Sequence, residues 1–192
     1  QMVSLGLAMS ISAILAYLIS FAIRSFIGHH GGAEMVGLYT AGYTIIITYV
    51  GMVFTALGTD YYPKLSGLCH DDIKCFELVN RQGEIACLIL TPLLVGCLVF
   101  MPFVIRILYS ESFMASIDYI AWAIPGVLFK LLGWLLAFII IAKGNSKKYL
   151  FIETIAKSYT ILLDVLLYSL WGLKGLGISS TASFVIYYFQ VI

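Results

Sequence analysis

Residues 85–105 read IACLILTPLLVGCLVFMPFVI, a run without one charged side chain. A helix rises about 1.5 Å per residue, so about 20 apolar residues cross the roughly 30 Å hydrocarbon core of a bilayer. Polar and apolar residues do not alternate here, as they would in a strand of a membrane barrel. Unpaired backbone groups cannot face lipid, which leaves the helix as the remaining structure. The run therefore predicts a transmembrane α-helix.

Five further runs of comparable length and apolar character flank this one. Together the six predicted spans cover residues 2–23, 36–58, 85–105, 119–142, 150–171 and 175–192. Most of the chain lies inside them, and only one connection, over 59–84, is long. We therefore expect an all-α fold, a polytopic transmembrane helix bundle of about six spans that forms a single transmembrane lobe over residues 1–192.

The composition supports a membrane location and excludes several classes of protein. Hydrophobic residues make up 61% of the chain and charged residues 11%, whereas soluble domains average about 45–50% and about 25%. The net charge of +1 provides no basic field for a nucleic acid. A soluble enzyme and a nucleic-acid-binding protein are not expected. Because the chain starts at Gln1 and stops inside the apolar run at Val191 and Ile192, we expect it to be a piece of a longer protein.

The lysines and arginines predict which side of the membrane each connection faces, because cytoplasmic loops carry the excess of these residues. Three of them lie in the 59–84 loop and three in the 143–149 loop. The opposite connections hold Arg24 and Lys174, with Arg106 at a helix boundary. We predict that both basic loops and the N-terminus lie in the cytoplasm.

The 59–84 loop contains a helical pattern of its own. Pro63 is predicted to end the second span, and Asp71 with Asp72 to cap a new helix. After them, apolar residues recur at helical spacing among charged ones. We expect an amphipathic helix lying on the cytoplasmic face, and an ordinary connector is the alternative.

The first span carries a small residue at every fourth position, at Ser4, Ala8, Ser12, Ala16 and Ser20. Small residues at this spacing let two helices approach closely in lipid, where no hydrophobic effect drives their association. We expect this face to pack against another helix.

Ionisable residues within the predicted spans are the strongest indication of function. A charge at membrane depth costs about 2.5–3.5 kcal/mol on insertion scales and usually faces a bundle interior or an aqueous cavity. With 3.6 residues per turn, Glu153 and Lys157 lie about 40° apart on the helix, and Asp164 lies about 20° from Glu153. Thr160 and Tyr168 share this face. We call these five residues the polar stripe and predict that it lines a hydrophilic cavity; a Glu153–Lys157 pair that neutralises itself is the alternative.

A further cation, Lys130, lies in the middle of the fourth predicted span. A compact ammonium group at this depth suits a phosphate or pyrophosphate. The alternative is a salt bridge to Asp164 or Glu153 with no ligand. Arg24 and Arg106 lie near the outer boundary of the membrane, where their long side chains can extend into lipid headgroups.

No motif in the sequence indicates catalysis. The phosphate-binding pattern G-x-x-x-x-G-K-[ST] does not occur in the sequence, and Cys69, His70 and Cys75 lack the close ligand pairs of a zinc site. We expect no enzymatic activity, no catalytic residue, no metal and no cofactor. The function that remains is movement of a molecule across the membrane, powered from outside this chain or by an ion gradient. In the second case Asp164 or Glu153 would couple transport to H⁺ or Na⁺.

Several short segments resemble one family. They are GLYTA at 37–41, YPKLS at 62–66, NRQ at 80–82, TP at 91–92, ILY at 107–109, ESF at 111–113 and KGNSK at 143–147. They resemble the polysaccharide flippases, the O-antigen and repeat-unit transporters of the multidrug/oligosaccharidyl-lipid/polysaccharide exporter superfamily. The likeness is best over about residues 33–116, and the six-span pattern extends it over nearly the whole chain.

The resemblance implies two six-helix lobes around a central cavity, with this chain similar to the C-terminal lobe. It implies alternating access that carries undecaprenyl-pyrophosphate-linked oligosaccharide from the cytoplasmic to the periplasmic leaflet of a bacterial cytoplasmic (inner) membrane. The implied partners are this lipid-linked oligosaccharide, membrane lipids and the polysaccharide polymerase machinery, with no nucleic acid. Cavity charges vary in position within the family, so the expectation that Lys130 and Lys157 contact the phosphates rests on the residues of this chain.

Three other functions fit the same features. A peptidoglycan-precursor flippase and a cation-coupled drug exporter belong to the same superfamily, and a non-transporting membrane scaffold of envelope assembly is a different class. A strongly acidic cavity in the other lobe would favour the drug exporter, because organic cations need carboxylates. A scaffold would tolerate neutralisation of the polar stripe.

Overall fold

The computed structural model describes residues 2–192 and places them in helices joined by turns. In chain order the helices are α1 (Met2–Ile45), the short π-helix η1 (Ile46–Val50), α2 (Gly51–Leu68), α3 (Asp72–Leu108), the 3₁₀-helix η2 (Glu111–Phe113), α4 (Ser116–Ala142) and α5 (Ser146–Val191). The predicted all-α fold is therefore confirmed.

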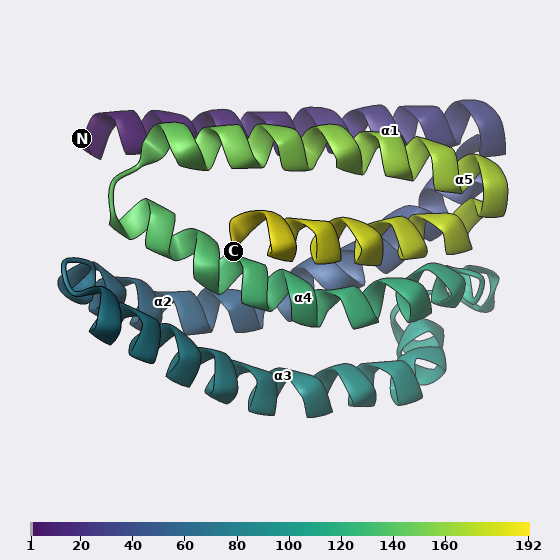
Figure 1. Cartoon of the computed structure of the whole chain (residues 1–192). Coiled ribbons are helices and arrows are strands. Elements are labelled where there is room, and N and C mark those ends of the chain that lie inside the picture. Colours follow the sequence, from purple (N-terminus) through teal and green to yellow (C-terminus); the bar gives the residue numbers. More distant parts are fainter. Residues whose placement is uncertain (1) are drawn as a thin grey trace.

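Two glycines reverse the chain inside the longest helices. The helical stretches long and apolar enough to cross a membrane, within the described residues, are four rather than about six: Gly6–Leu68, Asp72–Leu108, Ser116–Ala142 and Ser146–Val191. Gly32 (φ 78°, ψ 179°) interrupts α1, and Gly172 (φ 59°, ψ −135°) interrupts α5. Only glycine adopts these conformations without strain. Figure 1 shows the chain doubling back within α1 and within α5, so the four stretches provide six antiparallel segments.

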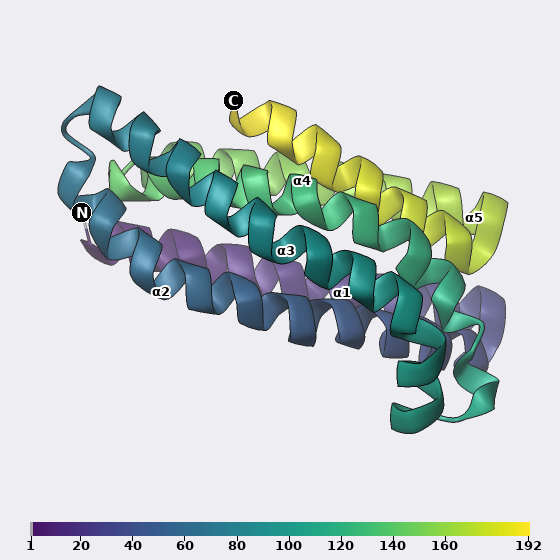
Figure 2. The ribbon, with the colours of Figure 1, turned by 90° about the horizontal axis from the view of Figure 1, so that it is seen from below.

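The two basic connections lie at the same end of the bundle, where α1 also begins (Figures 1 and 2). Lys143 Nζ and Asp72 Oδ1, 2.7 Å apart, join the α4–α5 turn to the start of α3, and this hydrogen bond raises the pKa of Lys143. Asp71 caps α3, as predicted, by accepting a hydrogen bond of 3.2 Å from the backbone N–H of Lys74. That bond lowers the pKa of Asp71. Both connections therefore face the same side, as the distribution of cations requires.

The connection predicted over 59–84 is helical instead. α2 continues past Pro63, and α3 begins after a short turn. Residues 72–84 form the first turns of α3 and not a separate amphipathic helix, because Cys75 and Val79 are buried inside the bundle. Hydropathy detects only the apolar part of a helix, so it misses the polar extensions of α2 and α3.

α4 is the central helix and contacts α1, α2, α3 and α5. Leu131 and Leu135 are completely or almost completely buried on it. The hydroxyl of Tyr61, itself fully buried, donates a hydrogen bond of 3.0 Å to the Leu135 carbonyl. This bond holds α2 against the middle of α4.

Glycines bring α4 into backbone contact with the second part of α5, residues 173–191. A Cβ atom at Gly126 would lie 2.6 Å from the Cα of Thr181, and one at Gly133 would lie 2.8 Å from the ring of Tyr187. Small residues at helix contacts permit this close approach in membranes. The second part of α5 is therefore docked tightly on α4, beside which it lies in both Figure 1 and Figure 2.

The small-residue face of the first span packs inward in part: Ala8 and Ser12 are buried, as predicted, whereas Ser20 is half-buried and Ala16 is exposed. Ala8 and Ser12 are 5% and 6% exposed, and Ser12 contacts α5. The side chain of Ser4 lies outside the described residues. Close helix contact at this face brings α1 alongside the first part of α5, residues 146–171.

The outer surface of the bundle is apolar. Large hydrophobic side chains more than half exposed occur on every long helix: Tyr17, Phe21, Met52, Leu88, Phe100, Phe103, Trp122, Leu162, Leu166 and Trp171. A soluble monomer does not expose so much contiguous apolar area, whereas a bilayer covers it with acyl chains. The molecule is a membrane protein, and the ionisable residues of its predicted spans, Lys130, Glu153, Lys157 and Asp164, are buried or half-buried.

Candidate functional site

A cavity of about 200 Å³ lies between α1, α4 and the two parts of α5. We call it the first cavity; Lys130, Lys157, Thr160 and Asp164 line it. A second cavity of about 370 Å³ adjoins it, shares Lys130, Lys157 and Thr160 with it, and is also lined by Glu153. The structure thus brings Lys130 and four residues of the polar stripe together around two cavities that share part of their lining.

The side chain of Lys130 lines both cavities, and its ammonium group has no counter-ion among the described residues. Its Nζ atom lies 5.1 Å from the ring centre of Phe184 and 5.8 Å from that of Phe54. Within the described part of the chain it forms no hydrogen bond and no ion pair, so the salt bridge to Asp164 or Glu153 is not formed. Aromatic faces attract a cation without neutralising it. The ammonium group is therefore available to an anion.

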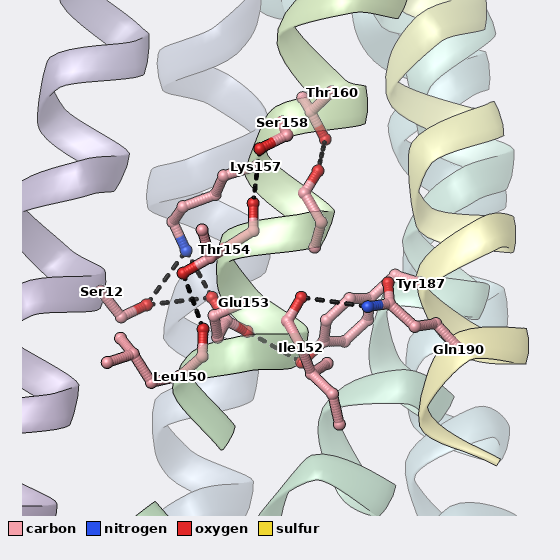
Figure 3. Close-up of polar contacts among 11 residues, drawn as sticks. Ser12, Leu150, Ile152, Glu153, Thr154, Lys157, Ser158, Thr160, Tyr187 and Gln190 are labelled. Atoms are coloured by element: carbon pink, nitrogen blue, oxygen red, sulfur yellow. Dashed lines mark hydrogen bonds and ion pairs between the residues drawn. The ribbon is translucent and has the colours of Figure 1, made fainter. Parts of the chain in front are cut away.

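Glu153 and Lys157 form an ion pair at the centre of a network shown in Figure 3. Lys157 Nζ also donates to Ser12 Oγ at 3.0 Å, and Ser12 donates to Glu153 Oε2 at 3.0 Å. Tyr187 donates to the other carboxylate oxygen, Oε1, at 2.9 Å. The Lys157 and Glu153 side chains are only 18% and 15% exposed. The self-neutralising pair considered from the sequence is thus formed, and it ties α1 to both parts of α5.

Asp164 is the buried carboxyl group of the first cavity. It is 8% exposed and accepts a hydrogen bond of 2.5 Å from Ser179. No lysine or arginine among residues 2–192 pairs with it. A buried carboxylate without a counter-charge is costly, so the group needs a proton or a bound cation. The hydroxyl-bearing side chains of Tyr39 and Ser180 line the same cavity.

The remaining two residues of the polar stripe differ in position. Thr160 lines both cavities, and its hydroxyl bonds the Ala156 carbonyl of its own helix at 2.8 Å. Tyr168 is buried against Phe26, with ring centres 5.9 Å apart, and its hydroxyl lies against Gly31. It lies near the Gly32 reversal and is not among the residues that line the two cavities.

The two arginines predicted at the outer boundary also differ. Arg24 stacks over Tyr43, which lines the first cavity, at 5.6 Å, and its Nε atom is buried without a hydrogen-bond partner among the described residues. It lies inside the bundle because α1 continues beyond residue 23, where the first span was expected to end. Arg106 is exposed at the end of α3, with its Nε 3.8 Å from Glu111 Oε1, in keeping with a boundary position.

One wall of the cavities was not predicted. Ser183 lines both of them, is 4% exposed, and has a hydroxyl without a hydrogen-bond partner among the described residues. Ser179, Ser183 and Tyr187 are four residues apart and form the polar face of the second part of α5. This spacing could have predicted a polar helix face. Serine and tyrosine are common in transmembrane helices, however, so they indicate a cavity less strongly than a charged residue does.

Comparison with known proteins identifies the family. A family described as polysaccharide biosynthesis protein matches residues 1–118, more than half of the chain. No curated protein and no solved structure matches the chain. The matched segment covers α1, α2 and α3, whereas Lys130 and the polar stripe lie after it. On the strength of this match, the chain belongs to the polysaccharide biosynthesis protein family.

Proposed function

We propose that the protein is a transporter that flips an oligosaccharide linked to undecaprenyl pyrophosphate from the cytoplasmic to the periplasmic leaflet by alternating access. The family gives it a role in polysaccharide synthesis or export. The apolar exterior and the charged cavities support passage of a polar headgroup through the bundle. The observation that carries the proposal is Lys130, an ammonium group without a counter-ion inside a cavity at membrane depth.

Lys130 is the proposed ligand of the pyrophosphate. An ammonium binds phosphate as a compact point charge, and the interaction is stronger inside a protein than in water because the effective dielectric constant is lower. The rings of Phe184 and Phe54 surround the cation with apolar surface. Lys157 can add a second contact only after it leaves Glu153, so it is the secondary ligand in this proposal.

The cavities are large enough for part of the substrate. The second cavity, at about 370 Å³, is within the range of small-ligand sites, and the first, at about 200 Å³, is smaller than that range. They suit the diphosphate and the sugar attached to it rather than a whole repeat unit. The lipid chain would remain in the bilayer, against the apolar exterior of the bundle.

Asp164 is the proposed site of ion coupling. It is buried, is held by the Ser179 hydroxyl alone among the described residues, and lines the cavity that Lys130 also lines. Its carboxylate needs a proton or a cation such as Na⁺ when no protein cation is near. Uptake and release of that ion would bias the bundle between its two states, because an ion shifts a conformational equilibrium only through differential binding.

The proposed location is the bacterial cytoplasmic membrane, with the N-terminus and the two basic connections in the cytoplasm. The excess of lysine and arginine in these connections supports this orientation, and their position at one end of the bundle is compatible with it. The polysaccharide polymerase machinery would receive the flipped substrate on the opposite side.

The test is transport in liposomes that contain the full-length protein and a fluorescent lipid-linked oligosaccharide. The flipped fraction is measured with a membrane-impermeant quencher. We expect Lys130→Gln to lower the initial rate about tenfold or more, because hydrogen bonds to charged groups contribute about 1.5–3 kcal/mol. The control is Lys64→Gln, which removes an exposed lysine paired with Asp60 on α2 and should leave the rate unchanged.

The alternatives give different results in the same assay. Asp164→Asn should abolish the dependence of the rate on a pH or Na⁺ gradient while leaving the protein folded. A wild-type rate in Lys130→Gln would overturn the assignment of the phosphate site. Transport of organic cations instead of the lipid-linked sugar would indicate the drug exporter, and no transport by the wild-type protein under any gradient would indicate the scaffold.

A further inference from the structure

The hydroxyl group of Thr181 lies within the backbone of α4, next to Pro125. Its Oγ1 accepts a hydrogen bond of 3.1 Å from the Gly126 N–H and donates one of 2.6 Å to the Trp122 carbonyl. In an uninterrupted helix these two backbone groups bond each other, because the amide of each residue bonds the carbonyl four residues earlier. A side chain from α5 thus bridges the two groups of one helical turn of α4.

The sequence around Pro125 explains why the bridge forms here. Proline has no N–H and its ring crowds the preceding turn, so the helix is weakened at this position. The missing N–H leaves the Ala121 carbonyl without its helical partner, and the next pair along the helix, Trp122 and Gly126, is the one that Thr181 bridges. Insertion of a side chain between such groups is a recognised cause of helix bending. Gly126 makes room for it, since a Cβ atom there would lie 2.7 Å from Thr181 Oγ1.

The bridge lies beside the residues that line the first cavity. Lys130 follows Gly126 by about one turn on α4, and Ser180, Ser183 and Phe184 flank Thr181 on α5. The Nζ of Lys130 lies 5.1 Å from the Phe184 ring centre. The direction of α4 beyond Pro125 therefore sets where Lys130 lies relative to the wall formed by α5.

We propose that Thr181 is a positioning residue of the cavity. Its hydroxyl joins α4 at Pro125 to residues 173–191, so the two helices move as one body and Lys130 keeps its place over Phe184 when the bundle changes state. The movement that opens the cavity then occurs on the side of α1 and residues 146–171. The bridge is a feature of the structure. Its expected effect on transport rests on the function proposed above.

The first experiment measures helix contact without transport. Phe129 and Tyr188, whose ring centres are 6.2 Å apart, are replaced by cysteine in the full-length protein without its native cysteines, and the rate of disulfide formation is recorded in liposomes. Thr181→Val, which keeps the shape and removes the hydroxyl, should lower this rate about threefold to tenfold. Thr181→Ser should restore it.

Two further variants make the result specific. Thr154→Val is the matched control, because within residues 2–192 the Thr154 hydroxyl bonds only the Leu150 carbonyl of its own helix. Its cross-linking should equal that of the parent. Gly126→Ala disrupts the same bridge from the α4 side and should behave like Thr181→Val. It is the variant to interpret if Thr181→Val does not fold. A parental cross-linking rate in whichever of the two is folded would overturn the proposal.

The second experiment measures transport as a function of substrate concentration. In Thr181→Val the half-saturating concentration of the labelled lipid-linked oligosaccharide should rise about threefold to tenfold, the range of one interhelical hydrogen bond in a membrane, and Thr181→Ser should restore it. A lowered maximal rate with an unchanged half-saturating concentration would overturn the positioning role. If cross-linking responds as expected while the wild-type protein moves no substrate, the bridge stands and the proposed transport function fails.

Discussion

At the scale of single residues, the buried charges differ in what balances them. Lys157 is paired with Glu153, Asp164 is held by the hydroxyl of Ser179, and Lys130 contacts aromatic rings. A balanced pair mainly fixes structure, whereas an unbalanced charge in a cavity requires something from outside the chain. This difference is why we propose phosphate binding for Lys130 and ion coupling for Asp164, and only a secondary ligand role for Lys157, whose charge is already balanced by Glu153.

The paired residues provide a prediction about stability. Lys157→Met leaves the Glu153 carboxylate buried without a cation, which should lower the free energy of unfolding by about 3–5 kcal/mol. Adding Glu153→Gln should recover much of this loss, because the amide is neutral and can still accept a hydrogen bond from Tyr187. Reversible unfolding in mixed detergent micelles measures both values. Additive losses in the double variant would show that the two charges do not interact.

At the scale of the helices, hydropathy located the spans but not their ends. The apolar residues of α3 identify its span, while the charged turns before it, at 72–84, are helical because Cys75 and Val79 are buried. Likewise, α1 runs on through residues 24–31 to the reversal at Gly32. A helix segment in the bilayer is recognised by its apolar composition. A segment that packs against other helices outside the bilayer has a mixed composition and is harder to recognise.

The sequence predicted one wall of the candidate site and missed the other. Periodicity placed Glu153, Lys157, Thr160 and Asp164 on one face because charges in lipid are conspicuous. The opposite wall, which includes Ser183, depends on how α5 folds back at Gly172, and that geometry is tertiary. A single-helix argument cannot supply it.

Substitution of Gly172 tests whether the reversal within α5 depends on glycine. Its φ of 59° and ψ of −135° are accessible to glycine alone, so Gly172→Ala should lower the free energy of unfolding by about 1–3 kcal/mol. Gly96→Ala is the control, since Gly96 lies within helical α3 and a Cβ atom there meets open space; it should be neutral or slightly stabilising. Equal stabilities of the two variants, measured by denaturant unfolding, would show that the reversal does not depend on glycine.

At the scale of the whole molecule, the bundle contains two tightly joined helix pairs. α4 is docked on residues 173–191 through glycines and the Thr181 bridge, and α1 is joined to residues 146–171 through Ser12. The two cavities lie between these pairs. A change in cavity shape therefore requires one pair to move against the other. The links between the pairs include the Gly172 reversal and the hydrogen bonds Tyr187–Glu153, Ser179–Asp164 and Gln190–Ile152.

The orientation of the whole bundle can be tested by thiol labelling. In a variant without native cysteines, Ser112→Cys should react with an impermeant maleimide added outside spheroplasts. Lys147→Cys should react only after the membrane is permeabilised, because the lysine-rich turn is predicted to be cytoplasmic. The reverse pattern would contradict the predicted orientation and leave the fold unaffected.

The reversal at Gly172 also constrains which length changes the protein can accept. Gly172 alone separates the two helical parts of α5. One residue inserted there would therefore rotate the returning helix by about 100°. Ser179 and Ser183 would then turn away from the cavity side, and exposed residues such as Phe189, 68% exposed, would turn toward other helices. Variation in chain length, including epitope tags, is therefore expected to be tolerated in the connection at residues 109–115 and rejected at Gly172.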